Sequence, residues 1–149
     1  MAMARMWVLV GESSRATLYA MVAKNGALEE LACYDNAEAR QHEQELTTDL
    51  PGQAFDGKGQ GQHGLESKAS KKERSAVDFA RSLCTVLDEG LRQGNYDQLV
   101  LCATPAFLGL LRQHLGPATG KCVAASINKN LVRASDEDIR QHVREALFT

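Results

Sequence analysis

Two apolar segments limit the fold of this chain more than any other feature of its sequence. Residues 6–11 (Met-Trp-Val-Leu-Val-Gly) are continuously apolar, and residues 97–103 (Asp-Gln-Leu-Val-Leu-Cys-Ala) contain a second run of the same kind. A strand whose two faces are both covered has this pattern, because few of its side chains turn to water. Both segments are therefore predicted to lie inside a sheet that carries helices on its faces.

The other elements follow from turn signals and helical periodicity. The Asn-Gly pair within residues 24–26 supplies the positive φ of a tight hairpin, which predicts that the first three strands form an antiparallel meander. Residues 70–73 (Ser-Lys-Lys-Glu) fit a capping box and predict the start of a long amphipathic helix at Ser70. A short helix is expected over residues 37–45. The remaining prediction places strands at 6–11, 16–23, 27–34, 97–103 and 121–127, and helices at 70–93, 104–115 and 135–147.

The order of these elements also predicts how the strands lie in space. Right-handed crossovers make the fourth and fifth strands parallel to the first. The result is an α/β fold with a ribonuclease-H-like, mixed five-stranded sheet in the order 3-2-1-4-5 and helices on its faces, as in several translation components. The length of 149 residues predicts a single domain over 1–149. Because Pro51 and five of the twelve glycines fall within residues 48–64, we predict a long flexible loop at about 48–69.

Several classes of enzyme are disfavoured by residues that the sequence lacks. A two-metal nuclease needs acidic side chains on the central strand, but residues 6–11 carry no carboxylate and Glu12 follows them. Residues 52–59 approach a P-loop pattern, yet Gly59 stands where the Mg²⁺-binding Ser or Thr belongs, and no buried strand precedes them. No serine stands in a Gly-x-Ser-x-Gly setting. We therefore expect no metal and no cofactor.

The cysteines and the amino-terminal residues bear on cellular location. The four cysteines are far apart and lack metal-ligand spacing, which predicts buried, reduced thiols. The apolar run at residues 6–10 is too short for a membrane span or a secretory signal. We therefore expect a cytoplasmic protein with no membrane partner, whose oligomeric state the sequence leaves open. The cysteines are Cys33, Cys84, Cys102 and Cys122.

The predicted loop contains the candidates for catalysis. Glycines alternate with polar residues from Gly57 onward, so the backbone can approach another molecule closely. Gln60 and Gln62 can position a water molecule, and His63 can accept a proton near its ordinary pKa of about 6.5. These three side chains are the candidate catalytic residues. The same composition fits a solvated linker between the sheet and the long helix, and both interpretations stay open.

Cations lie within this loop and after it. The chain has 17 Lys and Arg against 19 Asp and Glu, a net charge of -2, so any RNA contact must be local. Such a cluster of cations is more commonly the solvated start of a helix. The functional interpretation is that the cations bind the phosphate backbone of RNA. The candidate RNA-binding residues are Lys58, Lys68, Lys71, Lys72 and Arg74.

Seven short motifs spread over the chain can be compared with known families. They are Trp7–Val10, Thr47–Gly52, Phe55-Asp56, Gln62–Gly64, Phe79–Arg81, Leu99–Pro105 with Phe107–Arg112, and Lys129–Leu131. Together they resemble the bacterial host attachment protein family over nearly the whole chain. That family is similar in turn to the middle domain of archaeal and eukaryotic class 1 release factors, in which a Gly-Gly-Gln loop positions water on the peptidyl-tRNA ester.

The resemblance implies a partner and a chemistry. It implies the same sheet order, a ribosome or tRNA as partner, and assistance in peptidyl-tRNA ester hydrolysis by the glutamine-containing loop. The chain departs from these relatives in reading Gly59-Gln60-Gly61-Gln62 in place of Gly-Gly-Gln, and Asn130 in place of an expected aspartate. One hypothesis is therefore a cytoplasmic factor associated with the ribosome or tRNA. The alternative is a non-enzymatic interaction protein that affects attachment to host cells or surfaces.

Overall fold

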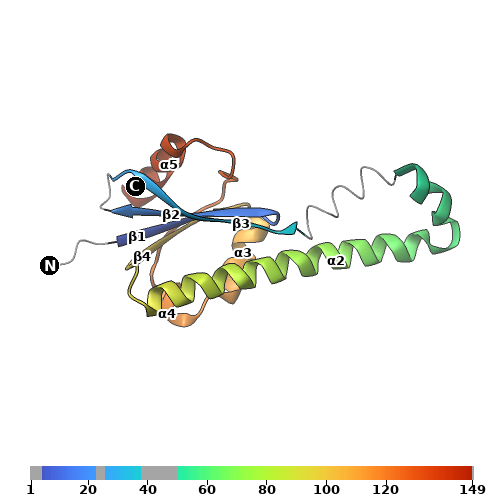
Figure 1. The fold of residues 1–149 in the computed structure, drawn as a ribbon, viewed down its shortest axis with the longest axis horizontal. Helices are drawn as coiled ribbons and strands as arrows, with labels where there is room; N and C mark the ends of the chain where they lie inside the picture. The colour runs from blue at the N-terminus through green and yellow to red at the C-terminus, as the bar shows by residue number, and fades with distance from the viewer. Residues whose placement is uncertain (1–4, 23–25, 38–49, 149) are drawn as a thin grey trace.

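The computed structural model describes residues 5–22, 26–37 and 50–148, with side chains for all of these except residues 22, 50–70 and 148. Its centre is a five-stranded sheet in the order β3-β2-β1-β4-β5 (Figure 1). β1 pairs antiparallel with β2 and parallel with β4, and β5 is parallel to β4. The predicted α/β architecture and strand order are confirmed. The strands are β1 (Arg5–Gly11), β2 (Arg15–Val22), β3 (Leu28–Asp35), β4 (Gln98–Ala103) and β5 (Val123–Ile127).

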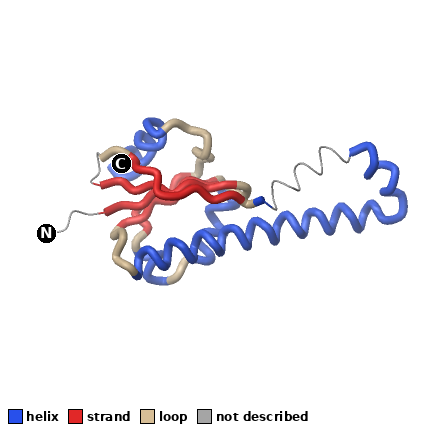
Figure 2. The backbone as a smooth tube through the Cα atoms, in the orientation of Figure 1, coloured by secondary structure: helices blue, strands red, loops and turns tan. Residues whose placement is uncertain are grey.

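Helices cover both faces of the sheet, as the two apolar strands require. α2 and α3 lie on one face and α5 on the other (Figure 2). The short helix α4, which the sequence did not predict, precedes β5, and this strand begins at Val123 rather than at the predicted residue 121. The helices are α2 (Leu50–Arg92), α3 (Pro105–His114), α4 (Pro117–Lys121) and α5 (Asp136–Phe148).

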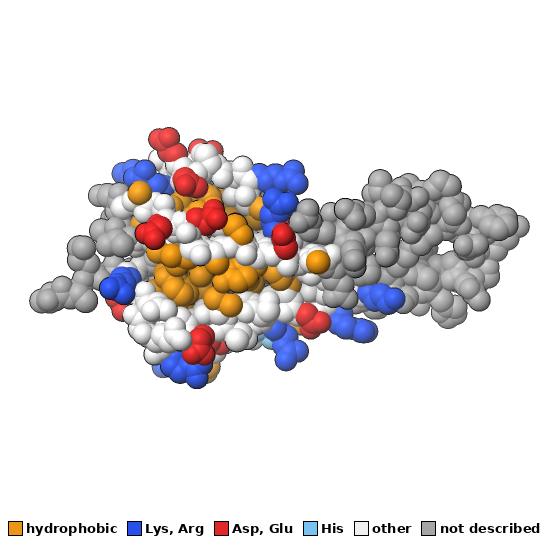
Figure 3. Space-filling view, in the orientation of Figure 1, with side chains coloured by type: hydrophobic (Ala, Val, Ile, Leu, Met, Phe, Trp, Pro, Cys, Tyr) orange, Lys and Arg blue, Asp and Glu red, His pale blue; other side chains and the backbone are white. Residues whose placement is uncertain are grey.

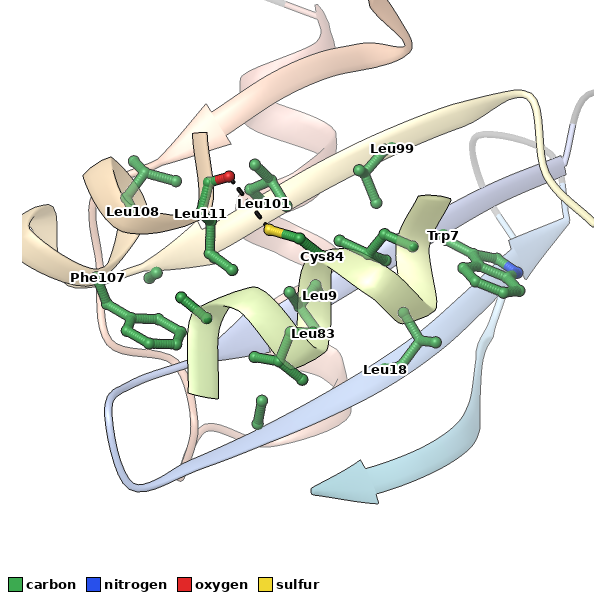
Figure 4. Close-up of a cluster of buried hydrophobic side chains, with 14 of the residues drawn as sticks. Trp7, Leu9, Leu18, Leu83, Cys84, Leu99, Leu101, Phe107, Leu108 and Leu111 are labelled. Atoms are coloured by element: carbon green, nitrogen blue, oxygen red, sulfur yellow. Dashed lines mark hydrogen bonds between the residues drawn. The ribbon is translucent and has the colours of Figure 1, made fainter. Parts of the chain in front are cut away.

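Alternating side chains of the central strands build two cores. Trp7 and Leu9 of β1 point toward α2 and α3, where they join a buried cluster with Leu101, Phe107 and other apolar residues (Figure 4). The intervening β1 side chains Met6, Val8 and Val10 face α5, and they pack with Val100, Cys102, Ile139 and Val143. Burial on both faces explains why β1 and β4 read as continuous apolar runs.

The predicted flexible loop at about 48–69 is wrong wherever the structure describes it. From Leu50 to Arg92 the backbone forms one helix, so the expected helix start at Ser70 lies inside α2. Pro51 is tolerated because the first turn of a helix needs no amide hydrogen at that position. Residues 50–70 contain no β-branched side chain, and each glycine costs only about 1 kcal/mol relative to alanine. Residues 48–49, 38–45 and 23–25, which carry parts of the predicted loop, short helix and hairpin turn, lie outside the described residues.

One part of α2 packs against the sheet, and the other part extends beyond it. From Ser75 onward its side chains enter the core against the sheet, whereas Lys71, Lys72 and Arg74 are exposed. Residues 50–74, here called the α2 arm, extend past the end of the sheet and bend near their beginning (Figure 1). Glycines are a recognised cause of such bends. The arm is therefore a projection attached to the domain by the buried part of the same helix.

Replacing arm glycines with alanine tests whether this segment is helical. Gly59→Ala together with Gly61→Ala is expected to raise the stability of the arm by up to about 1 kcal/mol per site, because alanine loses less backbone entropy on entering a helix. Circular dichroism at 222 nm during thermal unfolding measures the change. Gly94→Ala is the contrasting control, since Gly94 has a φ of 77° and alanine is strained there. If the Gly59→Ala/Gly61→Ala variant lost as much stability as Gly94→Ala, the result would contradict a helical arm.

The four cysteines differ in how deeply they are buried. Cys84 and Cys102 are buried, as predicted, and the Cys84 thiol donates a hydrogen bond to the carbonyl oxygen of Leu111 at 3.3 Å. Burial raises the pKa of each of these two thiols to about 12. Cys122 is half-buried. Cys33 is exposed, contrary to the prediction, because β3 is an edge strand whose outward side chains meet water.

Alkaline pH is expected to destabilise the fold. An ordinary thiol has a pKa of 9.0, but the folded chain holds Cys84 and Cys102 protonated to about 12, and burial also raises the pKa of Tyr96 from 10.0 to about 12. The folded state thus binds more protons than the unfolded state above pH 9, so stability falls as pH rises by up to about 1.4 kcal/mol per pH unit for each group.

Urea unfolding at about pH 8 and about pH 10 measures this effect, because these values lie roughly one unit below and above the ordinary thiol pKa. Cys102→Ala should show a smaller difference between the two conditions than the parent, because one titrating group is lost. Stability that does not change over this range would contradict the assignment.

Candidate functional site

The parallel strands and β3 end at one edge of the sheet, which we call the carboxyl edge. In open α/β sheets, ligands bind beyond the carboxyl ends of the strands. Here Glu12 follows β1, Asn36 follows β3, Thr104 follows β4 and residues 128–135, the β5–α5 loop, follow β5. The α2 arm projects from the same end of the sheet (Figure 1). This edge is therefore the candidate functional region.

Asn36 joins the sheet to α2 at this edge. Its side chain is only 9% exposed, and its Nδ2 lies 2.9 Å from Ser75 Oγ and 3.2 Å from the Ser75 carbonyl oxygen. The same amide donates to the carbonyl oxygen of Ser13 at 3.0 Å, and the backbone N–H of Asn36 donates to the carbonyl oxygen of Ser14 at 2.8 Å. One buried side chain thus fixes α2, where its arm begins, against the turn between β1 and β2.

Glu12 continues these contacts toward β5. Its Oε1 accepts a hydrogen bond from Ser14 Oγ at 2.8 Å, and its Oε2 accepts one from Asn130 Nδ2 at 3.2 Å. Asn130 Oδ1 in turn accepts from the backbone N–H of Val132 at 3.1 Å. Both oxygens of the carboxylate are therefore engaged in holding the β1–β2 turn to the β5–α5 loop. This gives Glu12 a structural task rather than that of a free acid or base.

These contacts form one hydrogen-bonded series along the carboxyl edge, which we call the edge network. It consists of Ser75, Asn36, Ser13, Ser14, Glu12 and Asn130. Sequence reasoning did not identify Asn36 or Ser75 as site residues, because they lie 39 positions apart and no local pattern pairs them. It noted Glu12 only for its place beyond the strand, and Asn130 only as a departure from an expected aspartate.

The predicted catalytic residues all fall on the α2 arm. The backbone of Gln60, Gln62 and His63 is helical there, and so is that of Lys58 and Lys68. The side chains of these five residues lie outside the described part of the structure, so their roles stay predictions.

The other predicted RNA contacts lie where the arm meets the sheet. Lys71, Lys72 and Arg74 are exposed there. Lys71 and Lys72 precede Ser75 by four and three positions, which places them on the same side of α2 as this anchored residue. The structure therefore directs two of the predicted cations toward the carboxyl edge.

The described residues form neither a metal-binding cluster nor a membrane-spanning helix. In residues 5–22, 26–37 and 50–148, no group of three or more His, Cys, Asp or Glu is arranged to hold a metal ion. Within the same ranges, no helix combines the length and the apolar character that a membrane crossing demands. The chemistry that the edge does offer is hydrogen bonding and positive charge.

Asn36→Ala tests the strength of the edge network. The substitution leaves the buried Ser75 hydroxyl without this partner, and we expect it to lower the free energy of unfolding by roughly 1 to 3 kcal/mol. Asn95→Ala is the matched control, because Asn95 is exposed. Among the described residues, its side-chain amide donates a hydrogen bond only to the exposed Gln93. Urea denaturation measures both. Equal stabilities of the two variants would show that Asn36 holds nothing together.

Comparison with known proteins identifies a family that the chain matches. The model of a family described as "Protein required for attachment to host cells" matches residues 7–143. The matched span contains the whole edge network and every candidate site residue named above. Comparison with curated proteins finds no match for the chain.

Proposed function

The chain belongs to the family of proteins required for attachment to host cells, and from this premise we propose that it acts as a binding protein whose partner is ribosomal or transfer RNA. The observation that carries the proposal is the α2 arm. It stands clear of the sheet, and where it meets the domain it exposes Lys71, Lys72 and Arg74. These three exposed cations on a helical projection offer a local contact for RNA on a chain whose overall net charge is -2.

We further infer that the fold is ribonuclease-H-like and related to the middle domain of class 1 release factors. The strand order β3-β2-β1-β4-β5, with α2 and α3 on one face and α5 on the other, supports this relationship. So does the presence of the glutamine-containing segment on a projection from the domain. A cytoplasmic location follows from the proposed partner, because ribosomes and tRNA are there.

The helical backbone of the arm favours binding over catalysis. Positioning water on an ester requires a segment that adapts to the reacting geometry. The backbone of Gln60, Gln62 and His63 instead belongs to one regular helix. We therefore assign the arm to RNA contact, and catalysis by these three residues stays a prediction tested by their alanine variants in a peptidyl-tRNA hydrolysis assay with ribosomes.

Charge reversal on the arm tests the proposed function. Lys71→Glu with Lys72→Glu is expected to weaken binding to tRNA or ribosomes by about tenfold or more, and to reduce the salt dependence of binding by about one unit of slope per lost phosphate contact. Ribosome co-sedimentation and tRNA binding at several KCl concentrations measure this. Arg81→Glu is the matched control, since Arg81 is an exposed cation on the part of α2 that covers the sheet.

Two outcomes would overturn this function. The parent protein could stay entirely out of ribosomal fractions and fail to bind tRNA, or the arm variant could bind as the Arg81→Glu variant does. Fractionation tests the alternative of an interaction protein that acts directly in attachment, because protein found mainly on the outer cell surface would contradict a cytoplasmic RNA partner.

A further inference from the structure

The β5–α5 loop, residues 128–135, is held firmly against the domain although it has no regular structure of its own. Leu131 is 6% exposed and belongs to the core on the α5 side, and Val132 and Ala134 pack against the same core. Asn130 connects the loop to Glu12. Lys129, which directly precedes these anchors, and Arg133, which lies between Val132 and Ala134, are exposed. Two cations are thus presented to solvent from a fixed piece of backbone.

The loop and the α2 arm border the same edge of the sheet. The edge network runs from Ser75 of α2 through Asn36 and the β1–β2 turn to Asn130, so it connects the two structures by hydrogen bonds throughout. Figure 3 shows Lys and Arg side chains both along α2 and above this end of the sheet. Lys71 and Lys72 lie at one end of the network, and Lys129 and Arg133 at the other.

Acidic groups also lie near this surface, and Glu73 is exposed between Lys72 and Arg74, but Glu12 is held in the edge network. Both carboxylate oxygens of Glu12 accept hydrogen bonds from Ser14 and Asn130. The first turn of α5 carries three acids, Asp136, Glu137 and Asp138, at the end of a helix where the peptide dipoles favour negative charge. The ion pairs described for the chain, Arg92 with Glu89 and His142 with Glu145, involve other residues. Among the described residues, the four cations are exposed and lie outside these ion pairs.

We propose that a single RNA strand lies across the carboxyl edge, with its phosphates held by Lys71 and Lys72 on one side and by Lys129 and Arg133 on the other. This inference rests on the proposed function and adds a second contact surface to it. The edge network sets the separation of the two cation pairs, because it fixes both the arm and the loop to the β1–β2 turn. Contacts to phosphate position a strand without reading its sequence, so the binding is expected to tolerate different RNA sequences.

The experiment compares charge reversals at the two ends of the network in the full chain. The loop pair is Lys129→Glu with Arg133→Glu, and the arm pair is Lys71→Glu with Lys72→Glu. The control pair is Lys121→Glu with Arg144→Glu, two exposed cations on α4 and α5 that lie outside the network. The probe is deacylated tRNA, and fluorescence anisotropy at several KCl concentrations gives affinity and salt slope. Circular dichroism establishes that each variant folds.

The loop pair is expected to weaken tRNA binding by about tenfold and to lower the salt slope by about one to two, as the arm pair does, with one tRNA bound per chain. If the loop pair binds like the control pair while the arm pair loses affinity, the second contact is refuted and the proposed function stands. If the parent binds no tRNA, the second contact and the proposed function are both refuted. If each chain binds two tRNA molecules, and each charge-reversed pair abolishes the binding of one of them, a single strand shared by the two cation pairs is refuted.

Discussion

Leu101→Ala is expected to lower the free energy of unfolding by roughly 2 to 5 kcal/mol, one of the two largest effects foreseen for this chain. Leu101 lies in β4 with its side chain fully buried, and it packs in the core between the sheet and the helices α2 and α3 (Figure 4). Removing its branched end withdraws apolar surface from this core and leaves a cavity that neighbours on both layers fill only in part.

Leu31→Ala is the matched control, because it makes the same chemical change at an exposed position. Leu31 is 42% exposed in the edge strand β3, and we expect its loss to cost about 0.5 kcal/mol or less. Urea denaturation of the parent and both variants gives the comparison. Similar losses at the two leucines would contradict the placement of β4 at the centre and β3 at the edge.

Gly90→Ala is expected to be the second severe substitution. A Cβ atom at this position of α2 would stand 2.5 Å from Cη2 and Cζ3 of Trp7 and 3.3 Å from Cε1 of Tyr96. These two rings are buried and stacked, with centroids 4.5 Å apart. The Trp7 ring or the helix must therefore shift, and we expect a net loss of roughly 1 to 3 kcal/mol in spite of the better helix propensity of alanine.

Gly109→Ala, in the neighbouring helix α3, is expected to have the opposite effect on stability. A Cβ atom there meets nothing within 4 Å, so the higher helix propensity of alanine is expected to stabilise the fold by up to about 1 kcal/mol. Thermal unfolding followed by tryptophan fluorescence reports on both variants, because Trp7 is the sole tryptophan. A Gly90→Ala variant as stable as the parent would show that α2 does not pack on Trp7 as described.

The sheet could be predicted from sequence because its signals are local and mutually consistent. Residues 6–11 and 99–103 are apolar on both faces, and β1, β4 and β5 formed in the predicted regions 6–11, 97–103 and 121–127. Once a long helix separates two buried strands, the handedness of crossovers leaves few arrangements, and the order follows. The edge strand β3 was placed correctly as well, although its exposed Cys33 was wrongly assigned to the interior.

The arm and the edge network could not be predicted for two different reasons. Glycine and proline indicate a loop when each residue is weighed by its propensity, but Pro51 occupies a tolerated position near the start of α2 and the glycines weaken a helix without forbidding it. The Asn36–Ser75 contact depends on a polar pairing between distant segments, which leaves no periodic trace in the sequence. The sequence singled out the cations Lys71, Lys72 and Arg74, whose contact with RNA stays a prediction, whereas their position relative to the β5–α5 loop emerges only when the strands are assembled.

The parallel pairing of β1 with β4 has a consequence for the chain during its synthesis. The amide of Arg5 contacts the carboxylate of Asp97, and these two residues are 92 positions apart. Hairpin pairing among β1, β2 and β3 needs only the first quarter of the chain, but the open side of β1 stays unpaired until β4 has left the ribosome several seconds later. During that interval Trp7, Val8 and Leu9 border an uncovered edge. Until β4 is made, the nascent chain therefore carries an unpaired apolar strand edge, the kind of edge that promotes aggregation.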